Sequence, residues 1–84
     1  MRLIEFAGRR YHVTFTQDWD VYGDIVEFRY LDDPSARVLV RVTGWNDADA
    51  LHLDVTTVAD LDPQFTEFAV EHAKELIGTD RDDA

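Results

Sequence analysis

Residues 62–78 read DPQFTEFAVEHAKELIG, and this stretch decides the fold because it predicts a long amphipathic helix. Asp62 is a favourable N-cap, and Pro63 fits the first helical position, where a backbone N–H would have no partner. Gly78 predicts the end of the helix. Such a helix is marginal alone in water, so the rest of the chain must cover its apolar stripe. That stripe consists of Phe65, Phe68, Ala69, His72 and Leu76.

The chain before this helix alternates between apolar and polar residues, which predicts strands separated by turns. Gly8-Arg9 suits a two-residue turn with glycine first, and this turn would place Phe6 opposite Tyr11. Residues 17–23 and 44–50 are acidic and predict loops. The predicted strands cover residues 2–6, 10–16, 24–31, 37–43 and 51–55.

The second predicted hairpin supplies the surface that the helix needs. Residues 32–36, DDPSA, are turn formers, and pairing across them places Val26 opposite Val42 and Phe28 opposite Val40. Aromatic and β-branched pairs of this kind suit a buried sheet face. The sequence therefore predicts an α+β fold, in which a five-stranded antiparallel meander sheet carries one C-terminal helix packed across one face. Residues 1–78 are expected to form one domain, and residues 79–84 a disordered acidic tail.

The charge balance limits the classes of partner. The 84 residues include 18 acidic and 8 basic side chains, for a net charge of −10, which repels nucleic acid at long range. There is no cysteine, and no apolar run is long enough to span a membrane. The first residues are too charged and too short for a secretion signal, so we expect a cytoplasmic protein.

The excess of acidic residues also makes the stability depend on salt. Composition of this kind is typical of proteins from a salt-loving or otherwise acid-biased proteome, and the repulsion between carboxylates opposes the compact state at low ionic strength. We predict that the melting temperature rises with added KCl, because salt screens this repulsion. Thermal unfolding over a KCl series tests the prediction, and a steady fall in melting temperature would contradict it.

The sheet side turned away from the helix, here called the outer face, is the first candidate site. Four of the seven arginines point to it in the predicted register, together with isolated apolar side chains. Apolar residues bordered by arginine are typical of protein interfaces, and a solvated face with cross-strand ion pairs is the alternative interpretation. We therefore expect an interaction or homo-oligomeric assembly module that binds a protein, either a different one or a second copy, through the outer face. Its predicted partner-binding residues are Ile25, Arg29, Leu31, Arg37, Leu39 and Arg41.

Two further hypotheses stay open. The arginines of the outer face could bind an anion or a nucleic acid, although the net charge of the chain opposes this. A small-molecule or enzymatic site could lie between the predicted loops that carry Trp19, Tyr22 and Trp45. The pattern of Asp18, Asp20 and other acidic residues does not match a calcium loop.

The sequence has no motif for catalysis or for metal binding. It has no Cys/His cluster with zinc spacing and no glycine-rich phosphate loop. The three histidines, His12, His52 and His72, are distributed over different predicted elements. We therefore expect no enzymatic activity, no cofactor, no metal and no membrane partner.

Overall fold

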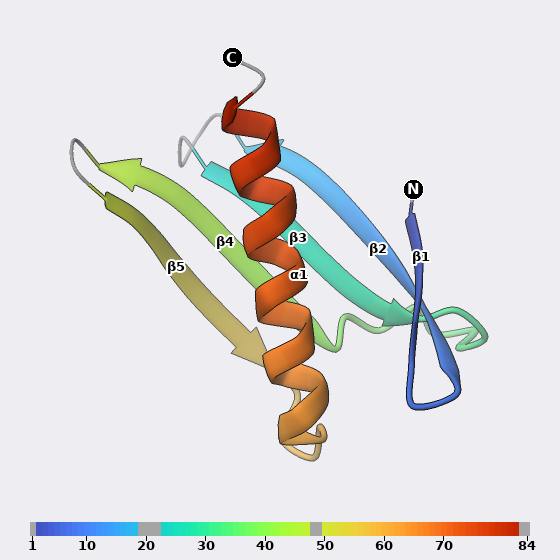
Figure 1. Cartoon of the computed structure of the whole chain (residues 1–84). Coiled ribbons are helices and arrows are strands. Elements are labelled where there is room, and N and C mark those ends of the chain that lie inside the picture. The colour runs from blue at the N-terminus through green and yellow to red at the C-terminus, as the bar shows by residue number, and fades with distance from the viewer. Residues whose placement is uncertain (1, 19–22, 48–49, 83–84) are drawn as a thin grey trace.

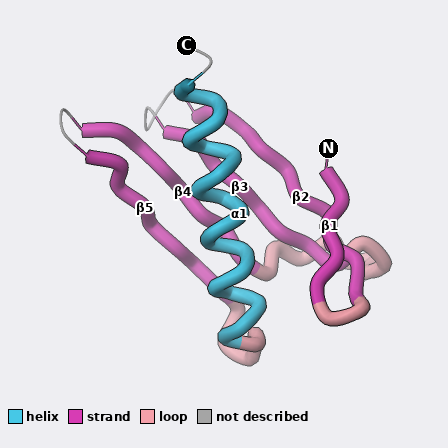
Figure 2. Tube along the Cα trace, viewed as in Figure 1, coloured by secondary structure: helices cyan, strands magenta, loops and turns pink. Residues whose placement is uncertain are grey.

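The computed structural model describes residues 2–18, 23–47 and 50–82 and shows a two-layer α+β fold. The five strands form one antiparallel sheet in the order β1-β2-β3-β4-β5, and the single helix lies across one face (Figures 1 and 2). This confirms the predicted fold class. The elements are β1 (Arg2–Phe6), β2 (Arg9–Asp18), β3 (Gly23–Tyr30), β4 (Val40–Asp47), β5 (Ala50–Thr57) and α1 (Pro63–Asp82).

Helix α1 begins as the sequence predicts but ends later. The Asp62 carboxylate accepts a hydrogen bond from the Gln64 backbone N–H at 2.9 Å, so Asp62 caps the first turn. At the other end, α1 continues to Asp82, and the predicted end at Gly78 is wrong. Residues 79–82, which were expected to be disordered, are helical. Glycine lowers helix propensity by only about 1 kcal/mol, which neighbouring residues can offset.

The core lies between α1 and the face of β2, β3 and β4 that the alternation predicted. From the sheet, Tyr11, Val13, Val26, Phe28, Val40 and Val42 are buried. From the helix, Phe65, Ala69, Ala73 and Ile77 are buried. Helix α1 crosses the strands at an angle and packs mainly on β3 and β4, with β5 to one side (Figure 1). The opposite side of the sheet, the outer face, has no helix over it in the described part of the chain.

The first hairpin has a different turn from the predicted one. The turn residues are Ala7 and Gly8, with φ angles of 52° and 80°, and Phe6 pairs with Arg9. Two positive φ angles correspond to a type I′ turn, which matches the twist of the flanking strands better than types I and II. Ile4 therefore pairs with Tyr11 rather than Val13. The shift is by two residues, so each side chain keeps its predicted face.

Replacing Ala7 with asparagine is expected to stabilise the protein. Ala7 has a left-handed backbone conformation, which costs an ordinary residue about 1 kcal/mol and which asparagine tolerates better. We predict that Ala7→Asn raises the free energy of unfolding by about 0.5–1 kcal/mol. Urea denaturation measures the change. An Ala7→Asn protein no more stable than the parent would contradict the observed turn.

The second hairpin has the predicted register but a longer connection. Val26 pairs with Val42, Glu27 with Arg41 and Phe28 with Val40, as predicted. Strand β4 begins only at Val40, so the connection between the strands spans residues 31–39. The predicted loop at 44–50 is mostly wrong, because β4 runs to Asp47 and β5 begins at Ala50.

Leu39 does not lie on the outer face, where alternation placed it. Its backbone N–H donates to the Phe28 carbonyl at 2.8 Å, although Phe28 pairs with Val40. Two consecutive residues thus oppose one residue of β3, which is the arrangement of a β-bulge. Strict alternation fails at a bulge, and Leu39 is 1% exposed within the core.

Candidate functional site: the outer face of the sheet

The outer face is built by alternate residues of all five strands. The register brings Leu3, His12 and Arg29 into one row across β1, β2 and β3. Its charged members form a balanced set, because Arg10, Arg29 and Arg41 are matched by Glu5, Glu27 and Asp54. Counted over these residues, the face is near neutral in a chain whose net charge is −10. This balance concerns only strand residues with described side chains.

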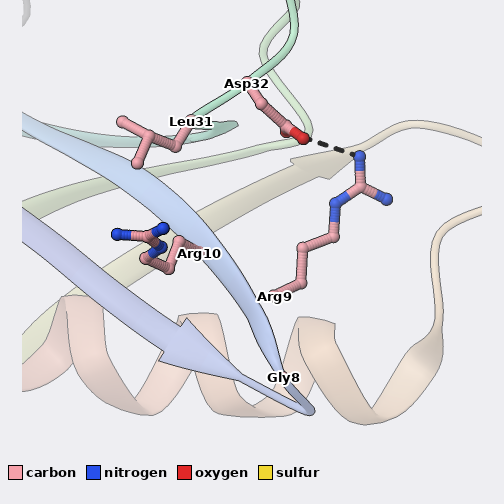
Figure 3. Close-up of a pocket in the computed structure, with 5 residues that line it drawn as sticks. All are labelled: Gly8, Arg9, Arg10, Leu31 and Asp32. Carbon is pink, nitrogen blue, oxygen red and sulfur yellow. Dashed lines mark ion pairs between the residues drawn. The ribbon is translucent and has the colours of Figure 1, made fainter.

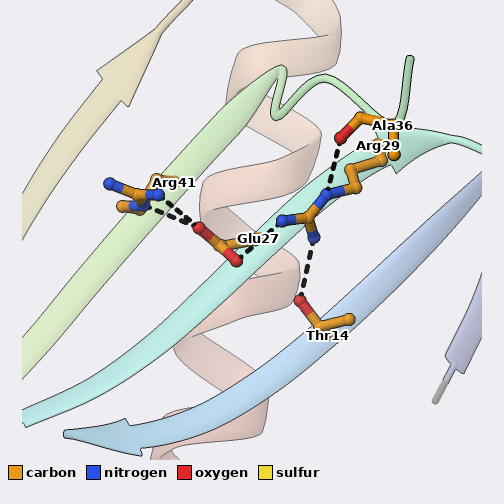
Figure 4. A network of polar contacts seen from close by, with 5 residues as sticks. All are labelled: Thr14, Glu27, Arg29, Ala36 and Arg41. Carbon is orange, nitrogen blue, oxygen red and sulfur yellow. Dashed lines mark hydrogen bonds and ion pairs between the residues drawn. The ribbon is translucent and has the colours of Figure 1, made fainter.

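Glu27 on β3 is the centre of a polar cluster on this face (Figure 4). One carboxylate oxygen, Oε2, lies 2.7 Å from Arg41 Nε and 2.6 Å from Arg41 Nη2. The other, Oε1, accepts a hydrogen bond from Arg29 Nη2 at 3.0 Å. Both arginines are thus held by one carboxylate, an arrangement with charge-assisted hydrogen bonds.

Arg29 is also tied to neighbouring segments. Its Nε donates to the Ala36 carbonyl at 3.0 Å, and its Nη1 donates to Thr14 Oγ1 at 3.2 Å (Figure 4). The guanidinium therefore connects β2, β3 and the loop before β4. Each of its nitrogens has a protein acceptor, which leaves it poorly placed to bind a phosphate. Its contacts with Thr14 and Ala36 could not be read from the strand pattern.

The arginines lower the pKa of Glu27. Burial by itself would raise this pKa, but the hydrogen bonds from Arg41 and Arg29 outweigh it, and the pKa lies below the ordinary value of 4.5. A carboxyl group with a lowered folded-state pKa adds stability above its unfolded pKa. That stability is lost as the pH falls through the folded-state value.

Removing the charge of Glu27 should therefore destabilise the protein in a pH-dependent way. We predict that Glu27→Gln costs about 1–2 kcal/mol at neutral pH, because Arg29 and Arg41 lose their charged acceptor. The difference from the parent should shrink as the pH falls below 4.5, where the parent carboxylate becomes protonated. Urea unfolding of both proteins over a pH series measures it. A difference that is constant with pH would contradict the assigned cluster.

The predicted partner-binding residues have different environments in the structure: some are exposed, and others are buried or held by ion pairs. Leu31 is 41% exposed, Arg37 and Arg41 are exposed, and Ile25 is half-buried. Arg29 is held in the Glu27 cluster, and Leu39 is in the core. The strands also expose two apolar side chains on this face that were not in the predicted set, Leu3 at 54% and Trp45. Leu3 is exposed because it lies on the edge strand β1, and Trp45 is exposed because it lies near the end of β4.

Of the three residues of the predicted loop site, the structure describes only Trp45, and it places Trp45 in a strand rather than in a loop. Trp45 lies in β4, and its ring stacks on His52 of β5 with centroids 5.6 Å apart. The pair is opposite across the β4–β5 ladder, so Trp45 is a strand residue on the outer face. Trp19 and Tyr22 lie outside the described residues.

A small pocket of about 250 Å³ lies beside the first turn (Figure 3). At its rim, Arg9 Nη2 is 3.7 Å from Asp32 Oδ1, and the Arg9 guanidinium lies 3.5 Å from the centre of the Tyr30 ring. These contacts are exposed and contribute little each. The pocket is lined by Gly8, Arg9, Arg10, Leu31 and Asp32.

The histidines do not come together. His72 lies in α1 with its ring 6.2 Å from the ring centres of Phe28 and Phe68, and His12 lies on the outer face. The Nε2 atoms of His12 and His72 are buried without a hydrogen-bond partner among the described residues. Within those same residues, no group of three or more acidic, histidine or cysteine side chains is arranged to hold a metal ion. None of the described helical residues forms a segment long and apolar enough to cross a membrane.

Comparisons of the chain with protein-family models, with curated proteins and with solved structures found no match.

Proposed function

We propose that this protein is a small protein-binding module whose contact surface is the outer face of the sheet. The observation that carries the proposal is the lack of a covering layer over this face in the described part of the chain, where large apolar side chains remain exposed between arginines. Leu3 and Leu31 are 54% and 41% exposed. Tryptophan and arginine, which this face also presents, are among the residues that most often dominate binding energy at protein interfaces.

The kind of interface follows from how these residues are spaced. Leu3 and Leu31 lie on either side of β2, and Trp45 lies near the other end of the sheet, on β4. The Glu27 cluster occupies the area between them. A divided apolar surface of this kind suits a polar, reversible interface better than the continuous apolar centre of an obligate dimer. We therefore favour a different protein as the partner on this face.

The charge of the chain selects the side on which a partner approaches. Most of the molecule repels an acidic protein, because the net charge is −10. Among its described strand side chains the outer face is near neutral, and it presents the exposed side chains of Arg10 and Arg41. We propose an acidic protein partner whose carboxylates meet these arginines, and a cytoplasmic location, which rests on the sequence alone.

The test compares two substitutions at residues of similar exposure on opposite faces. Leu31 is 41% exposed on the outer face, and Phe15 is 37% exposed on the helix side of β2. The parent, Leu31→Asp and Phe15→Asp proteins are immobilised, and the proteins that they retain from an extract of the source cells are quantified. We expect a partner that the parent and Phe15→Asp retain equally and that Leu31→Asp retains at least about tenfold less. Equal retention by all three proteins would overturn the proposal.

The anion-binding and loop-site hypotheses gain no specific support. Arg29 directs its donors to protein acceptors, and Trp45 is a strand residue stacked on His52. We do not propose either function.

A further inference from the structure

We propose that two copies of this chain pair edge to edge through β5, in an antiparallel register centred on Leu53. This goes beyond binding through the outer face and involves a different surface. Strand β5 is the last strand of the sheet and has only β4 as a neighbour in the described part of the chain. An open strand edge presents unpaired backbone N–H and C=O groups, which a further strand can satisfy.

The hydrogen-bond pattern shows which groups of β5 point outward. The Val58 N–H donates inward to the Leu39 carbonyl at 3.0 Å, and the β4–β5 register continues from this pair without interruption. Groups alternate along an antiparallel strand, so even-numbered residues of β5 bond to β4. The backbone groups of Leu51, Leu53 and Val55 therefore point to the open edge.

The two edges of the sheet differ in their protection. Strand β1 has five residues, of which Arg2 and Glu5 are charged, and a short charged edge strand resists pairing. Strand β5 has eight residues with no proline, glycine or lysine. Apart from Thr57, its side chains on the helix side are apolar, and Leu51 and Val55 are 40% and 39% exposed because α1 packs mainly on β3 and β4. The apolar layer is thus incomplete at the β5 edge.

The sequence of β5 complements itself in one register. With Leu53 opposite Leu53 of the second copy, Leu51 lies opposite Val55, and His52 lies opposite Asp54. The outward-pointing residues form the hydrogen-bonded pairs, which gives roughly six intermolecular backbone bonds. His52 and Asp54 fall in the other type of pair, where side chains are closest. A shift by one pair in one direction would place two Asp54 carboxylates together, and in the other direction two His52 rings.

The symmetry of this pairing leaves both outer faces accessible to a partner protein. An antiparallel pair has its two-fold axis perpendicular to the sheet, so both helices lie on one side and both outer faces on the other. The exposed Leu51 and Val55 side chains become covered between the two helices. The dimer thus presents two copies of the outer face on one continuous sheet.

The oligomeric state of the full chain gives the first test. Sedimentation equilibrium in raised KCl, which screens the repulsion between two acidic copies, should show reversible doubling of the 9.7-kDa mass with concentration. Val55→Lys should raise the dimer dissociation constant at least about tenfold, since lysine protects strand edges. The matched change on the other edge, Leu3→Lys, and the outer-face variant Leu31→Asp should leave it unchanged. A parent that stays monomeric, or equal weakening by Val55→Lys and Leu3→Lys, would overturn the proposal.

A charge exchange tests the register. His52→Asp puts a new carboxylate opposite Asp54 of the other copy at both symmetric contacts of the dimer, and it should raise the dissociation constant at least about tenfold. Adding Asp54→His to this variant places an aspartate opposite a histidine again at each contact. The dimer dissociation constant should then return to within about threefold of the parent value. A double variant that binds no better than His52→Asp would overturn the proposed pairing.

Amide hydrogen exchange gives a readout without any substitution. The amides of Leu51, Leu53 and Val55 should exchange more slowly as the protein concentration rises, whereas those of β1 should not change. Exchange at these three amides that is independent of concentration would also overturn the proposal.

Discussion

Phe65→Ala is expected to lower the free energy of unfolding by about 3–5 kcal/mol, the cost of truncating a fully buried phenylalanine. The Phe65 side chain is 1% exposed and joins α1 to three strands. Its ring stacks on Tyr11 of β2 with centroids 4.2 Å apart and contacts Phe6 of β1 at 5.6 Å. It also meets Phe28 of β3 edge-on at 6.1 Å. Removing the ring leaves a cavity in the centre of these contacts.

A phenylalanine on the same side of the sheet provides the control. Phe15 on β2 is 37% exposed, so Phe15→Ala removes the same atoms from a site that water already reaches. We expect a cost of about 1 kcal/mol there. Urea unfolding of both variants, with unchanged dependence on urea concentration, measures the two costs. Equal costs would mean that α1 does not cover Phe65 as described.

Gly44→Ala is the second large expected effect, because the helix approaches the sheet closely at this residue. A Cβ atom at position 44 would lie 2.7 Å from Ile77 Cδ1 and 3.2 Å from Leu53 Cδ2. Ile77 is fully buried, so its side chain has little room to move. Overpacking of this kind costs about 1–3 kcal/mol.

The same contact predicts a rescue. Ile77→Val removes the Cδ1 atom and alone should cost about 0.5–1.5 kcal/mol. In the Gly44→Ala background, the valine relieves the closest contact, so the double variant should be more stable than the sum of the two single costs predicts. A double-mutant cycle in urea measures the coupling. Strictly additive costs would contradict the close packing of α1 on β4.

The arrangement of layers could be predicted from the sequence because several local signals agree. The alternation of Val26, Phe28, Val40 and Val42 fixed the buried face, and the DDPSA turn fixed the register of the second hairpin. In the first hairpin, both Ala7-Gly8 and Gly8-Arg9 can form a two-residue turn, and the turn rules favoured the wrong pair. The error left every side chain on its predicted face, because the register shift is two residues.

Other features depend on contacts that periodicity does not contain. The bulge at Leu39 places this residue in the core instead of on the predicted outer face, and no residue type in the sequence marks the position of the bulge. Trp45 looked like a loop residue because acidic residues follow it, but strand pairing with β5 extends β4 past it. A meander places the last strand at an edge, so the open edge of β5 could have been predicted. Its incomplete coverage follows from where α1 crosses the sheet.

Both the fold and the proposed function require that α1 covers one face of the sheet and leaves the outer face accessible. The most direct measurement is the relaxation of methyl groups by a soluble paramagnetic compound in dilute, monomeric protein. We predict strong relaxation of the Leu3 and Leu31 methyls and weak relaxation of the Val26, Val42 and Ile77 methyls. Relaxation of Val26 and Val42 as strong as that of Leu3 would contradict this arrangement.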